Sequence, residues 1–440
     1  MSTMSSPVTD ATIEAGRRAL LQGWSTGAEP APIFVRASGA LMWDIHGNEY
    51  VDCTSQAWSN NIGASHERVV AATARQAADL THLRSNYHSI PLLQLAAKLT
   101  SVAPKGLDRV SFCLHGSSAV ESAMKIALKN AVAPGPFLAL RDGYHGRSFA
   151  TMGLSWPHAE NRFVPLYPSV IRVPQPYVYR SAPGETEEAV VARCIRELRD
   201  TIERAVDGHP VALIMEPVQG NGTQLDFPRS YYGAVRELCD ELQVLLIWDE
   251  IQTGFGPTGA MWASDLYDVI PDVLIFGKGI GGGFPLAGIL VRDGLKGFDA
   301  GDDALTFGQF PVSLAASLAA FEVIEEENLI ENCRVMGEYA TSRLREMQNR
   351  HRLIGDVRGP GLLIGIELVK DRETKEPALK EVVEVYRRGM ELGVIFGETR
   401  YAGLGNVVKI KPPLCVTREQ MDKALDAFDR ILTELETDHV

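Results

Sequence analysis

Short apolar runs alternate with amphipathic segments through the middle of the chain. Four such runs are "VALIMEPV" (211–218), "VLLIWDE" (244–250), "VLIFG" (273–277) and "LAGILVR" (286–292). Runs of this kind are typical of strands that are buried on both faces of a sheet. Between the first two, "SYYGAVRELCDELQ" has apolar residues at helical spacing. Strands that alternate with helices predict an α/β fold with a mostly parallel central sheet flanked by helices.

The two ends of the chain have a different pattern. "GALMWDIHGNEYVDC" predicts a short hairpin around His46, Gly47 and Asn48. "GLLIGIELV", "EVVEVYRRGMELGVIF", "VVKIKPPL" and "REQMDKALDAFDRILTEL" predict a small α+β unit in the C-terminal third. We therefore predict a large domain over 60–324 and a smaller domain built from both termini, 1–59 and 325–440. The Pro-rich stretch 173–185 is expected to be an excursion on the surface.

Composition narrows the class of protein. The formal net charge of -13 over 440 residues argues against a nucleic-acid partner, which requires clustered Lys and Arg. The six cysteines are far apart and form no CxxC pair, which favours reduced, buried thiols and suggests no metal site. The N-terminus has no apolar core of signal-peptide length, and no apolar run could span a membrane. We expect a cytoplasmic protein.

Three ionisable residues follow predicted strands: Glu216, Asp249 and Lys278. Ligands of parallel sheets bind beyond the carboxyl ends of the strands, so these residues are candidates for one site. Lys278, in "VLIFGKGIGGG", is not a P-loop lysine, because its glycines mostly follow it and Gly279 replaces the required hydroxyl. A solvated lysine remains an alternative. A buried lysine is costly unless it is neutral, and imine formation makes it neutral, as in pyridoxal phosphate chemistry.

Such chemistry needs an acid, a phosphate site and a residue that stacks on the ring. Asp249 precedes Lys278 by 29 residues, about one strand-helix-strand step, and could face the pyridine nitrogen; a helix N-cap is its alternative role. The phosphate site is predicted before an amphipathic helix, at Gly116, Ser117 and Ser118. An ordinary N-cap would explain these serines equally well.

The segment "RDGYHGRSF" supplies the stacking residue. Tyr144 is the candidate to lie flat on the ring, with His145 beside it. Arg147 could bind a substrate carboxylate through two hydrogen bonds. A structural ion pair is the competing interpretation of Arg147.

Together these segments resemble a known family. "HGSSAVESAMKIA", "DGYHGRS", "IMEPVQGNG", "WDEIQTGFGPTG", "LIFGKGIGGGFPLAG" and "TFGQFP" are similar, in order and spacing, to the class III aminotransferases, the group of ω-aminotransferases and 4-aminobutyrate and ornithine aminotransferases. The resemblance covers nearly the whole chain. It implies a fold-type I enzyme that uses pyridoxal 5'-phosphate and works as a homodimer, or a tetramer of two dimers, with active sites at the subunit interface.

The resemblance also implies roles for single residues. Lys278 would form the Schiff base and move the substrate proton, and Asp249 would pair with the ring nitrogen. The other implied cofactor contacts are Ile251 behind the ring, Gln252 at the ring hydroxyl, Tyr144 in front, and Gly116, Ser117, Ser118 and the partner subunit's Thr306 at the phosphate. Glu216 would be a supporting acid near the ring hydroxyl or a structural residue. Arg358 matches an architectural segment.

Departures from the family pattern concentrate on the substrate side. Many relatives pair an acid in "EPVQGEG" with a mobile arginine that binds the α-carboxylate of the keto acid, whereas this chain has Asn221 and Lys409 there. Neither residue can reproduce that ion pair. Other departures are Gln56, Ala57 and Trp58 in place of small pocket residues, Gln309 and Phe310 after Thr306, Ser118 in place of Glu, and Pro257 in place of Arg.

Two functions follow. The first is an aminotransferase that moves an amino group from an amino acid or ω-amine to a 2-oxo acid. The second is a racemase or epimerase of the same ancestry, which returns the proton to the opposite face of the substrate and needs a second base. Tyr144 and His145 are weak candidates for that base. Transamination is preferred.

Overall fold

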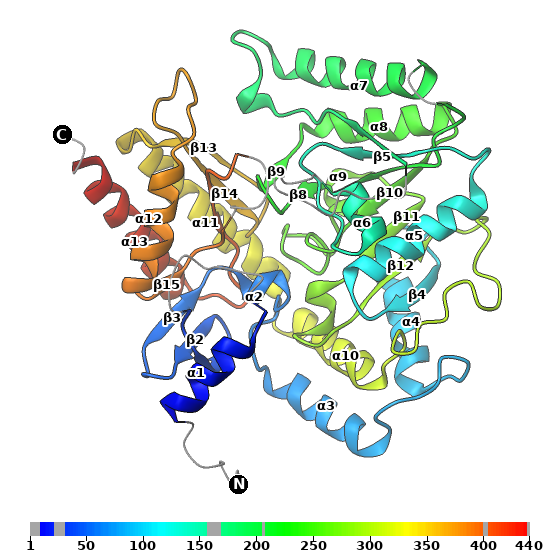
Figure 1. Ribbon diagram of the computed structural model, residues 1–440, viewed down its shortest axis with the longest axis horizontal. Coiled ribbons are helices and arrows are strands. Elements are labelled where there is room, and N and C mark those ends of the chain that lie inside the picture. Colours follow the sequence, from blue (N-terminus) through cyan, green and yellow to red (C-terminus); the bar gives the residue numbers. More distant parts are fainter. Residues whose placement is uncertain (1–8, 22–30, 156–168, 205–206, 399–403, 438–440) are drawn as a thin grey trace.

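The computed structural model describes residues 9–21, 31–155, 169–204, 207–398 and 404–437. Figure 1 shows two parts side by side. The middle of the chain, coloured cyan to green, forms the larger part around a central sheet. The first strands, in blue, lie beside the C-terminal helices and strands, in orange and red. The predicted boundaries at 59/60 and 324/325 stay predictions.

The central sheet has seven strands in the order β4-β12-β11-β10-β7-β5-β6. Their bounds are β4 Arg109–Cys113, β5 Phe137–Leu140, β6 Val170–Val173, β7 Ala212–Met215, β10 Leu245–Asp249, β11 Val273–Phe276 and β12 Ala287–Val291. The pairs β5 with β6, β5 with β7, β7 with β10 and β10 with β11 are parallel, and only β12 is antiparallel to its neighbours. The predicted mostly parallel sheet is confirmed.

Side chains alternate between the two faces of the sheet along each strand, and helices bury both faces. On one face, residues such as Leu213 and Trp248 pack with α7 (Glu187–Arg204) and α8 (Arg229–Glu241). On the other, Ile214 and Ile275 pack with α5 (Gly116–Asn130). The buried face of α5 consists largely of small residues, which let its axis approach the strands. This close approach brings the N-terminus of α5 to the carboxyl ends of the strands.

Helices outside the sheet complete the larger part and join it to the smaller one. These are α2 Ser55–Trp58, α3 Glu67–Asp79, α4 Ile90–Val102, α6 Phe149–Leu154, α9 Ala263–Tyr267 and α10 Pro311–Glu326, with one-turn helices η1 Val178–Arg180 and η2 Lys278–Gly281 and a ribbon of β8 Val218–Gln219 and β9 Leu225–Asp226. The N-terminal helix is α1 Asp10–Ala19. The apolar helix α10 packs against α3 and α4.

Two small sheets form the rest. One has the order β1-β2-β3-β15 (Phe34–Ser38, Leu41–Asp44, Glu49–Asp52, Val394–Ile395) and the other β13-β14-β16 (Ile354–Arg358, Ile364–Leu368, Val407–Ile410). The helices α11 Leu329–Arg350, α12 Leu379–Glu391 and α13 Arg418–Thr437 cover them. The predicted hairpin is confirmed, because β2 and β3 pair and Asp44 accepts hydrogen bonds from the amides of His46 and Asn48. Parallel pairing of β3 with β15 joins the two ends of the chain.

The Pro-rich stretch 173–185 is only in part the surface excursion that its composition predicted, because 182–184 are exposed but most of 173–181 is half-buried. Tyr177 donates a hydrogen bond to the fully buried Glu367 on β14, and Arg180 forms an ion pair with the same carboxylate. Arg358 also binds Glu367, at 2.7 Å, and donates to the carbonyl oxygen of Thr223. The prolines shape this segment, but its aromatic and charged side chains tie it to the smaller domain. Arg358 therefore has the architectural contacts expected of it.

Two further sequence predictions concern the cysteines and the possibility of a membrane-spanning helix. Of the six cysteines, five are buried and Cys415 is half-buried, and none forms a disulfide. None of the helices within the described ranges is long and apolar enough to cross a membrane.

Candidate active site

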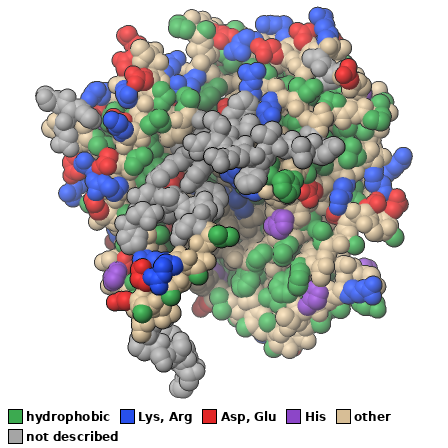
Figure 2. Space-filling model, in the orientation of Figure 1, with side chains coloured by type: hydrophobic (Ala, Val, Ile, Leu, Met, Phe, Trp, Pro, Cys, Tyr) green, Lys and Arg blue, Asp and Glu red, His purple; other side chains and the backbone are tan. Residues whose placement is uncertain are grey.

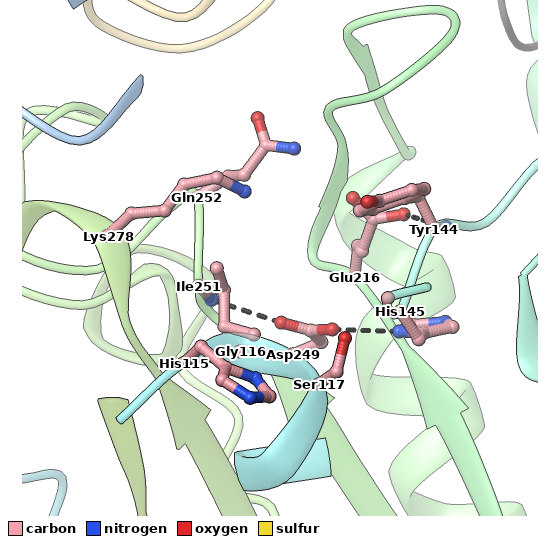
Figure 3. Close-up of a pocket in the computed structure, with 11 residues that line it drawn as sticks. His115, Gly116, Ser117, Tyr144, His145, Glu216, Asp249, Ile251, Gln252 and Lys278 are labelled. Atoms are coloured by element: carbon pink, nitrogen blue, oxygen red, sulfur yellow. Dashed lines mark hydrogen bonds and ion pairs between the residues drawn. The ribbon is translucent and has the colours of Figure 1, made fainter. Parts of the chain in front are cut away.

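The predicted reactive residues come together where neighbouring strands end. Asp249 is the last residue of β10, Glu216 directly follows β7, and Lys278 is two residues beyond β11. These three strands are adjacent and parallel, in the order β11-β10-β7. Their carboxyl ends therefore meet at one edge, with the start of α5 facing them. Figure 3 shows the side chains around the resulting cavity.

Lys278 begins the one-turn helix η2 with a φ of 47°. A positive φ is costly for a residue with a Cβ, and such strain in an L-residue is commonest at functional sites. Burial lowers the pKa of its amine, against the opposing charges of Asp249 and Glu216. A lowered pKa increases the fraction of neutral amine, which is the nucleophilic form.

Asp249 is held by two contacts. Its Oδ2 lies 2.8 Å from Nδ1 of His145, and its Oδ1 accepts a hydrogen bond from the amide of Ile251 at 3.1 Å. Burial works to lower the pKa of His145, but the hydrogen bond and charge of Asp249, with the charge of Glu216, raise it overall. The contact with His145 therefore holds the carboxylate of Asp249 in place. The sequence placed His145 beside the ring; the structure places it behind the carboxylate.

Glu216 fixes two loops around the cavity. Its Oε1 accepts from the amide of Tyr144 at 2.8 Å, and its Oε2 accepts from the amide of Gly220 at 3.0 Å. Burial, opposed by His145 and reinforced by Asp249, raises the pKa of this carboxyl to about 7. Both roles predicted for Glu216 remain open, since it supports the backbone and also lines the cavity.

The start of α5 differs in detail from the prediction. The helix begins at Gly116, so Gly116, Ser117 and Ser118 are its first three residues and do not precede it. His115 is the N-cap, and Ser118 exchanges hydrogen bonds with it in a capping box. Ser118 does not line the cavity, whereas His115 does. The hydroxyl of Ser118 is used in the cap, and the phosphate contact predicted for Ser118 stays a prediction.

Two glycines allow the backbone to close around this end. A Cβ on Gly116 would lie 2.9 Å from Cδ1 of Ile251, and one on Gly146 would lie 2.3 Å from Oγ of Ser117. Gly146 also has a φ of +129°. The sequence interpretation missed His115 and Gly146; the glycine between His145 and Arg147 was the available signal, because a glycine often marks close backbone approach.

The cavity has a volume of about 310 Å³, at the lower end of the range for small-molecule sites. It is lined by His115, Gly116, Ser117, Tyr144, His145, Gly146, Glu216, Asp249, Ile251, Gln252 and Lys278. In Figure 3, Lys278 and Gln252 lie on one side, Tyr144 and Glu216 on the other, and Asp249 and Ser117 below. Most of the predicted cofactor residues therefore share one cavity, with the exceptions of Ser118 and Thr306.

The predicted substrate residues lie outside this lining. Arg147 is exposed, with its guanidinium 5.3 Å from the ring centroid of Tyr144, and its amide donates to Oγ of Ser117 at 3.1 Å. Its side chain makes no ion pair with any described residue, which disfavours the structural alternative. Lys409 is fully buried, and its Nζ donates to the carbonyl oxygen of Asn221 at 2.7 Å. The two residues that replace the family's ion pair thus remain in contact.

Gln56, Ala57 and Trp58 belong to an unusual turn. The four residues of α2 all have φ between 45° and 64°, so this short helix is left-handed. Asp52 supports it by accepting hydrogen bonds from the amides of Thr54 and Gln56. The ring of Trp58 is half-buried, with its centroid 4.7 Å from Nζ of Lys409. The side chain of Gln56 accepts from Asn60, and Ala57 is exposed.

Comparison with known proteins identifies the family. The model of the class-III aminotransferases matches residues 25–432. The chain belongs to the class-III aminotransferase family. Among relatives of this aminotransferase, the isoleucine 2-epimerase of Lentilactobacillus buchneri is 36% identical, with 92% of this chain and 90% of the relative covered. The acetylornithine aminotransferase of Methanothermobacter thermautotrophicus is 34% identical, with 96% and 98% covered.

Solved structures agree with the fold. An aminotransferase of Bacillus anthracis superposes on this one with a TM-score of 0.90 at 30% identity, covering 98% of this chain and all of that chain. Class-III aminotransferases depend on pyridoxal phosphate and have the fold-type I architecture. The resemblance deduced from the sequence, its fold class and its cofactor are therefore confirmed.

The cavity of this aminotransferase fits pyridoxal phosphate. Two buried polar atoms, Nε2 of His145 and Oε1 of Gln252, have no hydrogen-bond partner among the described residues. The donor set is also complete: an amine, a carboxylate braced by an imidazole, and a helix N-terminus with a serine hydroxyl. These suit an aldehyde, a ring nitrogen and a phosphate, respectively.

Proposed function

We propose that this aminotransferase moves an amino group from an amino acid or ω-amine to a 2-oxo acid, with Lys278 as the residue that binds pyridoxal phosphate covalently. The observation that carries the proposal is the placement of the Lys278 amine and the Asp249 carboxylate on neighbouring strand ends of one cavity, opposite the start of α5. When bound, pyridoxal phosphate supplies a carbonyl carbon that joins amines and a ring that withdraws electrons.

The protein's own residues would orient the cofactor and move the proton. Lys278 takes the proton from the substrate Cα and returns it to another atom, for which a lowered pKa suits it. Asp249, braced by His145, would keep a proton on the ring nitrogen. The remaining contacts would be Tyr144 on one ring face, Ile251 on the other, Gln252 and Glu216 near the ring hydroxyl, and Gly116 and Ser117 at the phosphate.

We assign substrate binding to the predicted substrate residues, which lie outside the lining of the cofactor cavity. Arg147 is the carboxylate anchor, since its guanidinium lies over Tyr144 with its donors free of ion pairs within the described structure. Gln56, Ala57 and Trp58, on the left-handed turn, shape the side-chain pocket. In place of the mobile ion pair of relatives, Lys409 donates a hydrogen bond to the main-chain carbonyl oxygen of Asn221.

We also propose a homodimer in which each subunit completes the site of the other, in a cytoplasmic protein. Thr306 is exposed, and the neighbouring Phe307 exposes 49% of its surface. The loop that carries them is anchored to α5, because Asp303 accepts a hydrogen bond from Ser122 and pairs with Lys125 at 2.8 Å. An anchored, exposed apolar loop suits a contact with a partner subunit.

The test uses stoichiometric enzyme loaded with pyridoxal phosphate and a panel of amino acids and amines, without an acceptor. We expect the cofactor's absorption band to change and one equivalent of keto compound to appear for each good donor. Lys278→Ala should abolish both, and borohydride should attach the chromophore to Lys278 in the wild type only. If no donor in the panel produced a keto compound, transamination would be refuted.

Racemisation is the second candidate, and one observation favours it. Asn221 and Lys409 remain in contact but cannot act as the acid–arginine pair that relatives use for a second substrate. An enzyme that handles one substrate has no need of that exchange. The similarity to the isoleucine 2-epimerase also favours racemisation. In the assay above, a racemase would keep its absorption band while optical rotation decays.

A further inference from the structure

Lys409 is a buried amine for which transamination by Lys278 provides no use. It lies in β16, is 0% exposed and donates one hydrogen bond, to the carbonyl oxygen of Asn221 at 2.7 Å. Among the described residues, no carboxylate lies within ion-pair distance of its Nζ. A buried amine with one hydrogen bond and no carboxylate close enough to form an ion pair is costly. Such a group suggests a role in chemistry.

Its position is one residue from the cavity wall. Asn221, which accepts the hydrogen bond of Lys409, follows Gly220 in sequence. The amide of Gly220 donates to Glu216, and a Cβ on Gly220 would lie 2.3 Å from Oε1 of Gln252. Both Glu216 and Gln252 line the cofactor cavity. Lys409 itself is not among the lining residues, but its charge interacts with those of Glu216 and Lys278, which are. Its amine therefore lies behind the cavity wall, near these two residues.

Trp58 is the cover of this amine. Its ring centroid lies 4.7 Å from Nζ of Lys409, and its indole nitrogen is buried without a hydrogen-bond partner in the described structure. The ring stands on the left-handed turn, in which four residues with a Cβ have positive φ. Backbone strain of this kind clusters at active sites, ligand clamps and switch regions. A substrate that reaches the amine of Lys409 would have to displace this ring.

The pKa of the Lys409 amine lies close to neutral pH. Burial lowers its pKa to about 7, with Lys278 lowering it further and Glu216 and Glu398 opposing. Lys411, two residues along, is also fully buried and its pKa is lowered by burial and by both other lysines. A group that is half-protonated at the working pH can both donate and accept a proton efficiently.

Other groups at the cavity are less suited to that task. His145 is committed to Asp249 at 2.8 Å, behind the ring position. Glu216 uses one oxygen on the amide of Tyr144 and the other on that of Gly220. Tyr144 is the residue assigned to the ring face.

We propose that Lys409 is a second proton-transfer residue, which delivers a proton to the face of the substrate Cα opposite Lys278 and so interconverts amino acid enantiomers. The inference rests on the proposed function, because it needs Lys278 and bound pyridoxal phosphate to labilise the Cα proton. The C–H bond breaks, its proton goes to Nζ of Lys278 and its electron pair stays with the substrate. A new C–H bond forms with a proton from Nζ of Lys409. Solvent then takes one proton from Lys278 and returns one to Lys409.

The test measures inversion against transamination in the same reaction. The wild-type holoenzyme is incubated in D₂O with L-alanine, L-leucine or L-methionine, and the D-enantiomer, its Cα deuterium and the keto acid are quantified. We expect deuterated D-enantiomer from the wild type. Lys409→Met should lower the ratio of D-enantiomer to keto acid about 100-fold, the scale of one proton-transfer group. Lys411→Met, equally buried two residues away, is the matched control and should keep the ratio.

Two measurements separate chemistry from structure. Methylamine should restore the ratio in Lys409→Ala, because a small amine can occupy the vacated volume and transfer the proton. In the protein without cofactor, an NMR titration of labelled lysine, with Lys409 assigned by its loss in Lys409→Met, should have a midpoint of about 7. A midpoint near that of a free lysine would overturn the proposal.

The outcomes distinguish this inference from the function beneath it. Keto acid without any D-enantiomer from the wild type would overturn the role of Lys409 and leave transamination standing. An unchanged ratio in Lys409→Met would do the same. Loss of both products in the wild type would refute the proposed function itself.

Discussion

Buried charges at the strand ends are neutralised in three different ways. Asp249 is paired with His145, the pKa of Glu216 is raised to about 7 by burial, and that of Lys278 is lowered by burial. An uncompensated charge in such a place would cost several kcal/mol. The consequence for the proposed chemistry is that the amine of Lys278, the proposed nucleophile, becomes easier to deprotonate.

A single substitution tests the proposed role of Arg147 in substrate binding. We expect Arg147→Ala to raise KM for donors that carry a carboxylate about 10-fold or more, equivalent to about 1.5–3 kcal/mol for a hydrogen bond to a charged group, and to change KM for simple amines much less. Steady-state kinetics with matched pairs of amino acid and amine would measure this. Arg141→Ala, another exposed arginine in the same loop region, is the control; equal effects on both substrate types would remove the role of Arg147.

Single elements near the site depend on unusual backbone support. The left-handed turn of α2 is held by Asp52, and the short helix α9 is capped from a distance by Glu250. The oxygens of Glu250 accept from the amides of Ala263 and Ser264 at 2.7 and 2.9 Å. Both supports are buried carboxyls, 2% and 0% exposed. The stability of each element is therefore linked to a nearby acid as well as to its own sequence.

Ala57 allows the strain of the turn to be measured. Its φ of 63° and ψ of 36° cost an L-residue about 1–2 kcal/mol, whereas glycine adopts them freely. We expect Ala57→Gly to raise the thermal unfolding midpoint of the cofactor-free protein. Ala71→Gly, at an exposed position inside α3, should lower it, since glycine destabilises a right-handed helix by about 1 kcal/mol. A lower midpoint for both variants would argue against a strained turn.

The raised pKa of Glu250 predicts that the stability of the folded protein depends on pH. Burial raises its pKa from 4.5 to about 7, against the hydrogen bonds of Ala263, Ser264 and Thr253. Because the folded protein then binds the proton more tightly than the unfolded chain, the contribution of this group to stability is fully present below pH of about 4.5 and is lost as the pH rises through about 7. The shift corresponds to about 3 kcal/mol.

Glu250→Gln removes this titration. We expect the fall in stability between pH 5 and pH 8 to be smaller in the variant than in the wild type, as measured by thermal unfolding at both values. Glu241→Gln, on the exposed part of α8, is the control and should keep the wild-type slope. Identical slopes for Glu250→Gln and the wild type would contradict the raised pKa.

At the scale of the molecule, the sequence predicted what depends on regular patterns. Strands buried on both faces give apolar runs, so the central sheet and the meeting of Glu216, Asp249 and Lys278 followed from the sequence. The left-handed turn did not, because no glycine in Ser55–Trp58 marks it. The burial of 173–181 depends on Glu367, almost 190 residues away. The capping role of His115 is equally hidden, since histidine is not a favoured N-cap.

Assembly gives the last prediction. If the partner subunit's Thr306 completes the phosphate site, each active site needs Lys278 from one chain and Thr306 from the other. Lys278→Ala lacks the amine, and Thr306→Asp should repel the phosphate, so each homodimer should have little activity. In a heterodimer, one of the two sites has a native Lys278 from one chain and a native Thr306 from the other. If the two chains pair at random, half of the dimers are heterodimers. Each heterodimer has one intact site of two, so the mixture should have about a quarter of the wild-type activity.

Co-expression of the two variants with different affinity tags, followed by tandem purification, would isolate the heterodimer. Its activity should be about half that of the wild-type dimer, because one site of two is intact. A heterodimer as inactive as its parents would mean that Thr306 serves the site of its own chain, whereas a Thr306→Asp homodimer as active as the wild type would mean that Thr306 serves neither site. A monomer by light scattering would remove the shared site altogether. Because Thr306 is exposed on an anchored loop, its loss in Thr306→Asp should leave the fold of each subunit intact, so restored activity can only come from pairing.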